Sequence, residues 1–320
     1  MTAVVPVEPA LLERVLDHTH PLSPDGLDRL GHGKLSSAQS KTAWGRRSQH
    51  RFALVDGVDL LAGAEQYDLD GMADGRPIRI CGIGSLFTHP AHRGQGHAPA
   101  LLETLLERAR RAGAELALLF APPGLEGDVR AGFAALPLTE ATLDVGESPR
   151  HGAPMTMVRG GEERDLPAIV AMGRVRAERF RFHLDRDVDL VQYAITRKRL
   201  LAGLSPPARR QLHFFIAEEG TTAAAYVVVT IAGDTWTLEE CGDRDPSGAR
   251  VGALLQALIA REPGERRPTI RSWLPPGFLP PQITLASAVP AAEAVMVRSL
   301  NAPAPQWSAE DVLYWRNDVF

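Results

Sequence analysis

The sequence predicts an α/β (α+β) protein made of two tandem domains, and three observations support this. The chain has 320 residues, which suits two domains of about 150 residues each. The first half alternates strand-like runs with one strongly amphipathic helix, and the second half repeats that order about 153 residues later. We place the first domain at residues 1–150 and the second at 155–320, joined by a Gly/Ser/Pro/His-containing stretch.

The first half predicts its elements in a clear order. Helices are expected over residues 7–18 and 38–46, and strand-like runs cover residues 51–56, 60–70 and 77–88. Between the last two runs, GMADG (71–75) is typical of a hairpin loop. An amphipathic helix begins near Ala98 and stops at Gly113, and a short apolar run (115–121) suits a buried strand. Residues 131–145 supply two more short strands.

The second half resembles the first residue by residue in two places. At a shift of 153, LLETLLER (101–108) falls on LLQALIAR (254–261), and Pro-Pro-Gly at 122–124 falls on Pro-Pro-Gly at 275–277. At a shift of 163, FALVDG (52–57) resembles FIAEEG (215–220). A repeat of this length is too long for a solenoid, so the pattern indicates a duplicated domain.

Composition excludes several classes of protein. The net charge is −4 with no long basic block, so we expect no nucleic-acid partner. Cys81 and Cys241 are the only cysteines, which favours reduced thiols, and no sequence spacing typical of a metal site occurs. The start of the chain lacks the pattern of a signal peptide, and the longest apolar run, near 223–232, is too short to span a bilayer. We therefore expect a cytoplasmic protein without a membrane partner.

The stretch HPAHRGQGHAP, residues 89–99, leads into the amphipathic helix. A helix N-terminus carries unsatisfied N–H groups and a partial positive charge, so it suits an anion. Gly94 and Gly96 would let the backbone approach that anion closely, and Arg93 adds a charge. At a shift of 153 the second copy has Pro246 and Ala249 where Arg93 and Gly96 stand, so we expect the anion site in the first copy alone.

Two well-known phosphate loops do not fit this stretch. The P-loop requires a lysine after its last glycine, and none is present here. The dinucleotide fingerprint requires a third glycine, and Pro99 occupies that position.

Residues 93–98, RGQGHA, resemble the pyrophosphate loop R/Q-x-x-G-x-G/A of the GNAT superfamily of N-acetyltransferases. The flanking order is also similar: a long hairpin, a strand followed by x-x-Pro, the loop, the helix, an apolar strand and a Gly-Phe pair at 132–133. The resemblance covers residues 50–145 and, in degenerate form, 155–300. It implies two tandem GNAT-like domains, each a mixed, mostly antiparallel sheet flanked by helices, with the second copy degenerate.

The resemblance implies acetyl-CoA as co-substrate and no metal. Backbone N–H groups of the loop would bind the pyrophosphate, and the end of the preceding strand would pair with pantetheine through main-chain groups. The implied binding residues are Leu86, Phe87, Thr88, Arg93, Gly94, Gln95, Gly96, His97 and Ala98.

The sequence departs from the family pattern at two places. Many members carry a tyrosine, acting as general acid, four residues before the glycine of the Gly-Phe pair, where this chain has Asp128. Many also carry an asparagine after the apolar strand, where this chain has Pro122 and Pro123. The acetyl-CoA site is therefore better supported than any general acid.

Glu65 and Tyr67 are the candidate catalytic residues, because alternation places both on one face of the central hairpin. A glutamate inside an apolar strand is unfavourable without a partner or a task. Glu65 therefore serves the acceptor amine, lies on the solvent face or pairs with an arginine. Another candidate base is the terminal carboxylate of Phe320, because acetyltransferases of the enhanced-intracellular-survival type also pair two GNAT domains and use such a group.

The resulting hypothesis is an N-acetyltransferase that moves acetyl from acetyl-CoA to a primary amine of a small molecule. The stretch GSLFTHPAHRGQGHA (84–98) is also similar to fungal-type lysine N-acetyltransferases, which points to an amino-acid acceptor. The alternatives are a non-catalytic acyl-CoA binding or sensing protein, and a mycothiol synthase-like acetyltransferase, which would keep its working loop in the second copy. The sequence leaves open whether the chain forms an oligomer.

Overall fold

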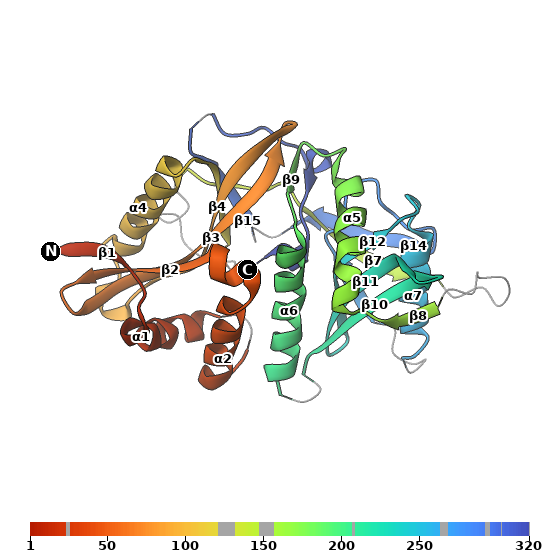
Figure 1. Cartoon of the computed structure of the whole chain (residues 1–320), viewed down its shortest axis with the longest axis horizontal. Helices are drawn as coiled ribbons and strands as arrows, with labels where there is room; N and C mark the ends of the chain where they lie inside the picture. Colours follow the sequence, from red (N-terminus) through yellow and green to blue (C-terminus); the bar gives the residue numbers. More distant parts are fainter. Residues whose placement is uncertain are drawn as a thin grey trace. The chain divides into compact units, whose positions relative to one another are not determined.

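The protein folds into two compact units, seen in the computed structural model (Figure 1). The structure describes residues 1–23, 26–120, 132–146, 157–206, 209–262, 268–291, 295–301 and 303–319. The first unit comprises residues 1–136, 292–306 and 319–320, and the second comprises 137–291 and 307–318.

The first unit is built on a mixed sheet with strand order β1-β2-β3-β4-β5-β15-β6. Only β4 and β5 pair in parallel, and the other neighbours along this path are antiparallel. The strands are β1 (Thr2–Pro6), β2 (Gln49–Asp56), β3 (Asp59–Ala73), β4 (Arg76–Thr88), β5 (Ala114–Phe120), β6 (Ala134–Ala135) and β15 (Val295–Ser299). The helices are α1 (Pro9–Thr19), η1 (His20–Leu22), α2 (Arg29–Ser40), α3 (Ala43–Ser48), η2 (Pro90–His92) and α4 (His97–Arg111).

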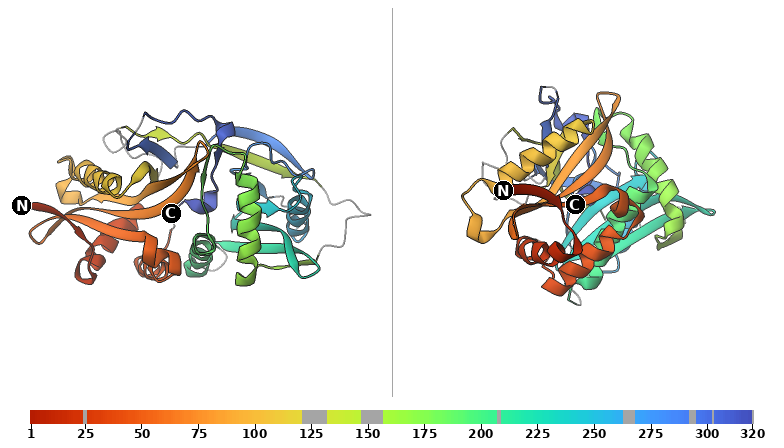
Figure 2. Two further views of the ribbon diagram at one scale, coloured as in Figure 1. Left: turned by 45° about the horizontal axis from the view of Figure 1, so that its top comes forward. Right: turned by 60° about the vertical axis from the view of Figure 1, so that its left-hand side comes forward.

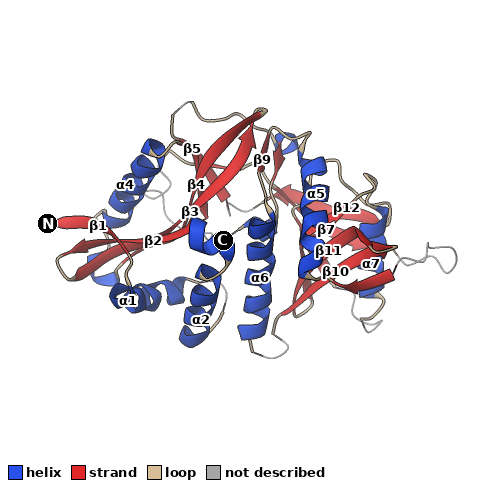
Figure 3. Cartoon of the chain, in the orientation of Figure 1, coloured by secondary structure: helices blue, strands red, loops and turns tan. Residues whose placement is uncertain are grey.

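Helices cover both faces of this sheet (Figures 1 and 3). The apolar stripe predicted on α4 is buried: Leu101 and Leu105 pack against Ile83 and other strand residues in one core cluster. On the opposite face, Val15 of α1 packs with residues of β2, β3 and β4, including Phe87. A two-sided core of this kind explains why the strands read as nearly continuous apolar runs.

The second unit is also a sheet with helices beside it (Figure 2). Its sheet order is β14-β7-β13-β12-β11-β10-β8, and only β12 and β13 pair in parallel along this path. Its strands are β7 (Thr139–Val145), β8 (Met157–Gly160), β9 (Phe182–Leu184), β10 (Gln211–Glu219), β11 (Thr222–Ala232), β12 (Thr235–Asp243), β13 (Thr269–Ser272), β14 (Ile283–Pro290) and β16 (Val312–Leu313). Its helices are η3 (Glu163–Asp165), α5 (Leu166–Ala177), α6 (Val188–Leu204), α7 (Ala249–Ile259), η4 (Ala309–Asp311) and η5 (Arg316–Asp318).

The duplicated plan expected from the sequence is confirmed. The order β2-β3-β4-α4-β5 recurs as β10-β11-β12-α7-β13, and each sheet carries its parallel pair at the same place. The turns after β2 and β10 also match, because Gly57 and Gly220 both adopt positive φ there (58° and 63°).

The compact units differ from a division of the chain near residue 150. Strand β7 directly follows the first repeat in sequence, yet it pairs with β13 and β14 of the second sheet. Strand β15 follows the second repeat, yet it pairs with β5 and β6 of the first sheet. Strand β7 thus joins the second sheet and β15 the first, which a linear reading of the sequence has no means of detecting.

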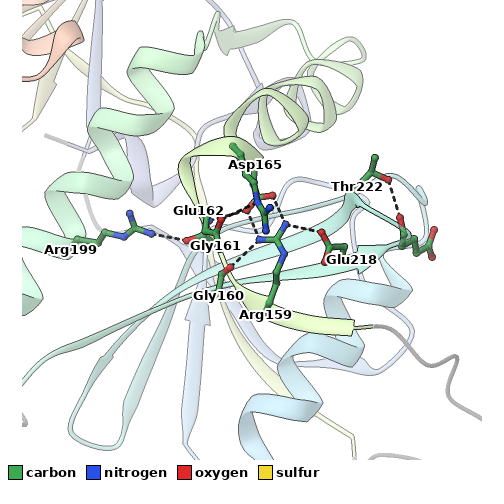
Figure 4. Close-up of polar contacts among 10 residues, drawn as sticks. Arg159, Gly160, Gly161, Glu162, Asp165, Arg199, Glu218 and Thr222 are labelled. Carbon is green, nitrogen blue, oxygen red and sulfur yellow. Dashed lines mark hydrogen bonds and ion pairs between the residues drawn. The ribbon is translucent and has the colours of Figure 1, made fainter.

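An ion cluster fixes the edge strand β8 of the second unit (Figure 4). Arg159 donates to both carboxylate oxygens of Asp165 at 2.7 Å and to Glu218 on β10 at 3.1 Å. Asp165 in turn accepts the N–H of Glu162 in a capping box, and Arg199 of α6 donates to the carbonyl of Gly161. These contacts join β8 to the helices that follow it, which is a structural role.

A buried polar cluster holds the C-terminal segment in the second unit. Arg186 donates to both oxygens of Glu240 on β12, at 2.8 and 2.6 Å, and lies 3.1 Å from Asp318. Asn317 donates to Glu240 at 2.9 Å, and the Tyr226 hydroxyl also donates to Glu240. Burial raises the pKa of Asp318 to about 7; Arg186 opposes this shift, and the charge of Glu240 adds to it.

The described residues include no helix long and apolar enough to cross a membrane.

We predict that Asp318 makes stability depend on pH. An unfolded aspartate titrates near 3.8, whereas the folded pKa is about 7. Between these values the folded state holds a proton that the unfolded state lacks, so stability falls as pH rises, by at most about 1.4 kcal/mol per pH unit. The substitution Asp318→Asn should therefore gain stability relative to the parent protein between pH 5 and 7 and level off above pH 7.

Urea unfolding at pH 5, 6, 7 and 8 measures this difference. Asp234→Asn, at an exposed turn position, is the matched control and should track the parent protein at every pH. Parallel curves for the parent and Asp318→Asn would show that Asp318 does not bind the extra proton.

Candidate acyl-CoA site

Strand β4 runs on beyond the last residue that pairs with the described part of β5, which ends at Phe120. Their parallel pairing ends at Ile83 and Leu119, while β4 continues to Thr88. Beyond this point Phe87 and Thr88 still pair with β3 on the other side. On the side away from β3, this stretch of β4 has no pairing partner among the described residues, and N–H and C=O groups at such an edge suit an extended ligand that carries amides.

The predicted pantetheine residues lie on this open stretch. The side chains of Leu86 and Phe87 are buried in the two cores on either side of the sheet, and Thr88 is half-buried. Only the main chain of Leu86 and Phe87 is therefore available to a ligand, whereas part of the Thr88 side chain is exposed.

The glycine-rich loop after β4 has the geometry of an anion site. Gly94 and Gly96 have φ values of 74° and 77°, which favour glycine, and Gly96 is the N-cap of α4 without a side-chain cap. A Cβ at either glycine would meet no atom within 4 Å, so the space before the helix is open in the described structure.

The hydrogen-bond donors of this loop are unsatisfied within the described part of the chain. The N–H groups of residues 94–98 find no acceptor there, as expected for the first turn of a helix. Arg93 is exposed and forms no ion pair with any described residue, while Gln95 contacts His97 at 3.3 Å. Ala98 is buried against the sheet and fixes the helix start. Positive and hydrogen-bond-donating groups thus converge on one open space.

A row of imidazole rings borders the loop. The ring centroids of His18 and His89 are 4.4 Å apart, those of His89 and His92 5.3 Å, and those of His92 and His97 6.0 Å. Burial and the neighbouring His89 lower the pKa of His18.

No group of His, Cys, Asp and Glu side chains that could hold a metal ion occurs in the described ranges.

The second copy keeps a glycine at the corresponding helix start, which corrects the sequence alignment. Gly248 is the N-cap of α7 with φ 72°, one position away from the residue that the ungapped shift of 153 pairs with Gly96. The buried residues of α7 align with those of α4 at a shift of 153 residues. The two N-cap glycines, Gly96 and Gly248, align at a shift of 152. The absence of a glycine therefore does not distinguish the two copies.

Occupied space and satisfied donors distinguish the second copy instead. A Cβ at Gly248 would lie 2.5 Å from the Phe278 ring and 3.1 Å from Pro280. The backbone N–H of Arg250 donates to the carboxylate of Asp243 at 2.9 Å, and the Arg250 guanidinium binds the same carboxylate. Asp243 thus occupies the place where α7 would receive an external anion.

Glu65 lies in a buried polar cluster on the opposite side of β3 from α4. Arg51 donates to it at 2.7 Å, the Tyr67 hydroxyl at 2.5 Å and Ser85 at 3.5 Å. Burial alone would raise the pKa of Glu65, but the charge of Arg51 and these hydrogen bonds outweigh burial and lower it. The alternative in which Glu65 pairs with an arginine is therefore what the structure contains.

Tyr67 is almost fully buried, at 3% exposure. Its ring stacks on Trp44, with centroids 6.3 Å apart, and contacts the edge of Phe120 at 6.1 Å. The structure thus brings Glu65 and Tyr67 together as expected, but it directs the Tyr67 hydroxyl at Glu65.

Sequence reasoning missed Arg51 and Ser85, which complete this cluster. The glycines at 82 and 84 inside β4 were an available signal, because glycine within a strand often marks a bulge. Three positions raised by the sequence analysis, Asp128, the Pro122-Pro123 pair and Phe320, lie outside the described residues.

The open loop and the amphipathic helix behind it form a candidate anion site in an α+β domain. Residues 35–128 match the family model described as an acetyltransferase (GNAT) domain. The match lies within the first unit, which is therefore similar to GNAT acetyltransferase domains, a family that uses acyl-CoA.

Solved structures of similar fold include GCN5-related N-acetyltransferases from Kribbella flavida (TM-score 0.64, 17% identity, 95% of this chain and 73% of that one) and Anabaena variabilis (0.65, 13%, 94% and 73%). Eis1 from Mycobacterium abscessus is also similar (0.59, 14%, 94% and 74%). At these identities the likeness concerns the fold alone. The search among curated proteins found no match.

We predict that Arg93 and the loop glycines hold the phosphates of acetyl-CoA. Arg93→Ala should weaken binding roughly 10–150-fold, because a lost hydrogen bond to a charged group costs about 1.5–3 kcal/mol. Gly96→Val should weaken binding at least as much, since a β-branched side chain is strained at φ 77° and fills the open space.

Calorimetric titration with acetyl-CoA measures both effects. Arg110→Ala, at the far end of α4, controls for loss of an arginine, and Gly57→Val, at φ 58° in an open turn, controls for backbone strain. Unchanged affinity in Arg93→Ala and Gly96→Val would reject this assignment of the site.

Proposed function

We propose that the first unit is an N-acetyltransferase that moves acetyl from acetyl-CoA to a primary amine of a small molecule. The main support is the contrast between the similar starts of α4 and α7. At α4 the space is open and the N–H groups have no acceptor among the described residues, whereas at α7 Phe278 and Asp243 fill the corresponding place. The match to a GNAT acetyltransferase domain supports the acyltransferase class, and the acetyl group and the small amine are further parts of this proposal.

The reaction needs no resident cofactor beyond the acyl donor. The amine nitrogen attacks the thioester carbonyl, a C–N bond forms, the C–S bond breaks, and the proton lost by nitrogen passes to the sulfur or to water. An alkylammonium has a pKa near 10.4, so only a small fraction is nucleophilic at pH 7. The site would gain rate chiefly by placing the neutral amine against the thioester.

The mycothiol synthase-like alternative would place the working loop in the second copy. The occupied helix start of α7 and the buried carboxylate of Asp243 (side chain 0% exposed) count against binding there. The C-terminal segment also packs against β12, where Asn317 donates to Glu240. We therefore favour binding in the first unit.

A non-catalytic acyl-CoA binding protein is the second candidate function. It is favoured by the lowered pKa of Glu65, because a carboxylate that stays charged does not take up a proton near pH 7. The Tyr67 hydroxyl is buried and bonded to this carboxylate, so it is not directed at a ligand. A thiol-release assay separates the candidates. An enzyme produces CoA in an acceptor-dependent way with some member of a panel such as L-lysine, glycinamide and spermidine, whereas a sensor binds acetyl-CoA and releases none.

We predict that each chain binds one acetyl-CoA. Calorimetric titration should give a stoichiometry near one, and the double change of Gly94 and Gly96 to valine should abolish binding. Asp243→Ala tests the second copy, because it removes the internal carboxylate without emptying the space filled by Phe278, and the stoichiometry should remain one. Two sites, or one that survives the Gly94 and Gly96 changes, would contradict this assignment.

We also predict that Glu65 acts at the acceptor end. Glu65→Gln keeps the shape and removes the charge that orients its neighbours, so turnover should fall by about 10²-fold while acetyl-CoA affinity holds. Glu115→Gln, at a surface ion pair with Arg76, is the matched control. Normal turnover in Glu65→Gln would leave Glu65 with a structural role alone.

A further inference from the structure

Ser85 stands at an irregular point of β4. Opposite β3, Gly63 faces Phe87 and Glu65 faces Gly84, so β4 carries an extra residue between these pairs. Ser85 lies in this bulge with φ 50°, in the left-handed region that residues other than glycine rarely adopt.

Turn geometry does not account for this conformation. The other described non-glycine residue with positive φ is Asp74, also at 50°. Asp74 precedes Gly75 in the tight turn between β3 and β4, where such a conformation is required and aspartate tolerates it. Ser85 is inside a strand whose neighbouring positions 82 and 84 are already glycine, so a glycine at 85 would relieve strain. Its hydroxyl is the feature that a glycine would lose.

The hydroxyl of Ser85 contacts the buried carboxylate of Glu65. Ser85 Oγ donates to Glu65 Oε2 at 3.5 Å, the outer limit of a hydrogen bond. Tyr67 donates to the same oxygen and Arg51 to the other one. Tyr67 is buried whereas Ser85 is exposed, so Ser85 is positioned to connect this carboxylate to a ligand.

Ser85 also lies where the thioester would arrive. It is two residues beyond Ile83, the last residue of β4 that pairs with the described part of β5. Along the strand it is about 10 Å from Thr88, at about 3.3 Å per residue. A pantetheine chain that runs along residues 86–88 from the loop would therefore bring its thioester end to Ser85.

We propose that Ser85 Oγ accepts a hydrogen bond from the N–H of the acceptor amine, and that Glu65 is a positioning residue acting through Ser85. The Ser85 proton points at Glu65, which leaves the oxygen lone pairs free to accept from the amine. The amine is thereby held in its neutral, nucleophilic form with its own lone pair directed at the thioester. This inference rests on the proposed acetyltransferase function.

The test removes the hydroxyl in two ways that affect the backbone differently. Ser85→Ala retains the strained φ, and Ser85→Gly relieves it. Both should raise the KM for the acceptor about 10-fold and lower kcat, as measured by CoA release with the best amine of the panel, while the Kd for acetyl-CoA stays unchanged. Asp74→Ala and Asp74→Gly make the same backbone changes at φ 50° in the hairpin turn and should leave both kinetic constants unchanged.

A double-mutant cycle tests the coupling between the two residues. If Glu65 acts through Ser85, Ser85→Ala should lower turnover much less in the Glu65→Gln background than in the parent protein. Because Glu65 then moves no proton, Glu65→Gln should lower the pH–rate profile without changing its shape.

The outcomes separate this inference from the proposed function. A parent protein that turns over while both Ser85 variants keep the parental KM and kcat overturns the role of Ser85 alone. Additive losses in the cycle overturn the action of Glu65 through Ser85. A parent protein that binds acetyl-CoA and releases no CoA with any amine overturns the proposed function and, with it, the role of Ser85.

Discussion

The first turn of α4 is the feature on which the first unit's chemistry depends, because its N–H groups have no acceptor among the described residues. Such donors are unfavourable to bury and favourable to direct at an anion. The left-handed glycines 94 and 96 keep the space in front of them open, and the core contacts of α4 hold the helix behind it. Beyond Ile83, β4 continues toward this anion site without a described partner on the side of β5, and Ser85 and its contact Glu65 lie at the start of that stretch.

The second unit shows what the same backbone does when those donors are satisfied internally. It has the same strand order, the same parallel pair and a left-handed glycine before its helix. Asp243 supplies the anion, and Phe278 fills the space in front of Gly248. A glycine at this place is thus a requirement of the turn, and binding depends on what stands before it. The fold can therefore be kept after a duplication while one ligand site is lost.

The sequence was sufficient for the features that depend on local pattern. The period of α4, the hairpin and the repeat all follow from residue spacing, and the structure contains each of them. Contacts between segments far apart in the chain left no pattern in the local sequence. The exchange of β7 and β15 between sheets, and the pairing of Arg51 with Glu65, depend on which segments meet after folding. The shift between the cap and the buried face of α7 was also missed, since an ungapped alignment forces both into one register.

The charge balance around Glu65 constrains what the acceptor end can recognise. Its carboxylate is paired with Arg51 at 2.7 Å, and both side chains are mostly buried, so the pair presents little net charge to a ligand. A cationic amine would gain little from such a neutralised pair, in contrast to an isolated carboxylate. Recognition must then come from hydrogen-bond geometry, which favours the neutral amine, the form that attacks a thioester. A lowered pKa at Glu65 is consistent with this role, because a group that only orients its neighbour has to stay charged throughout the reaction.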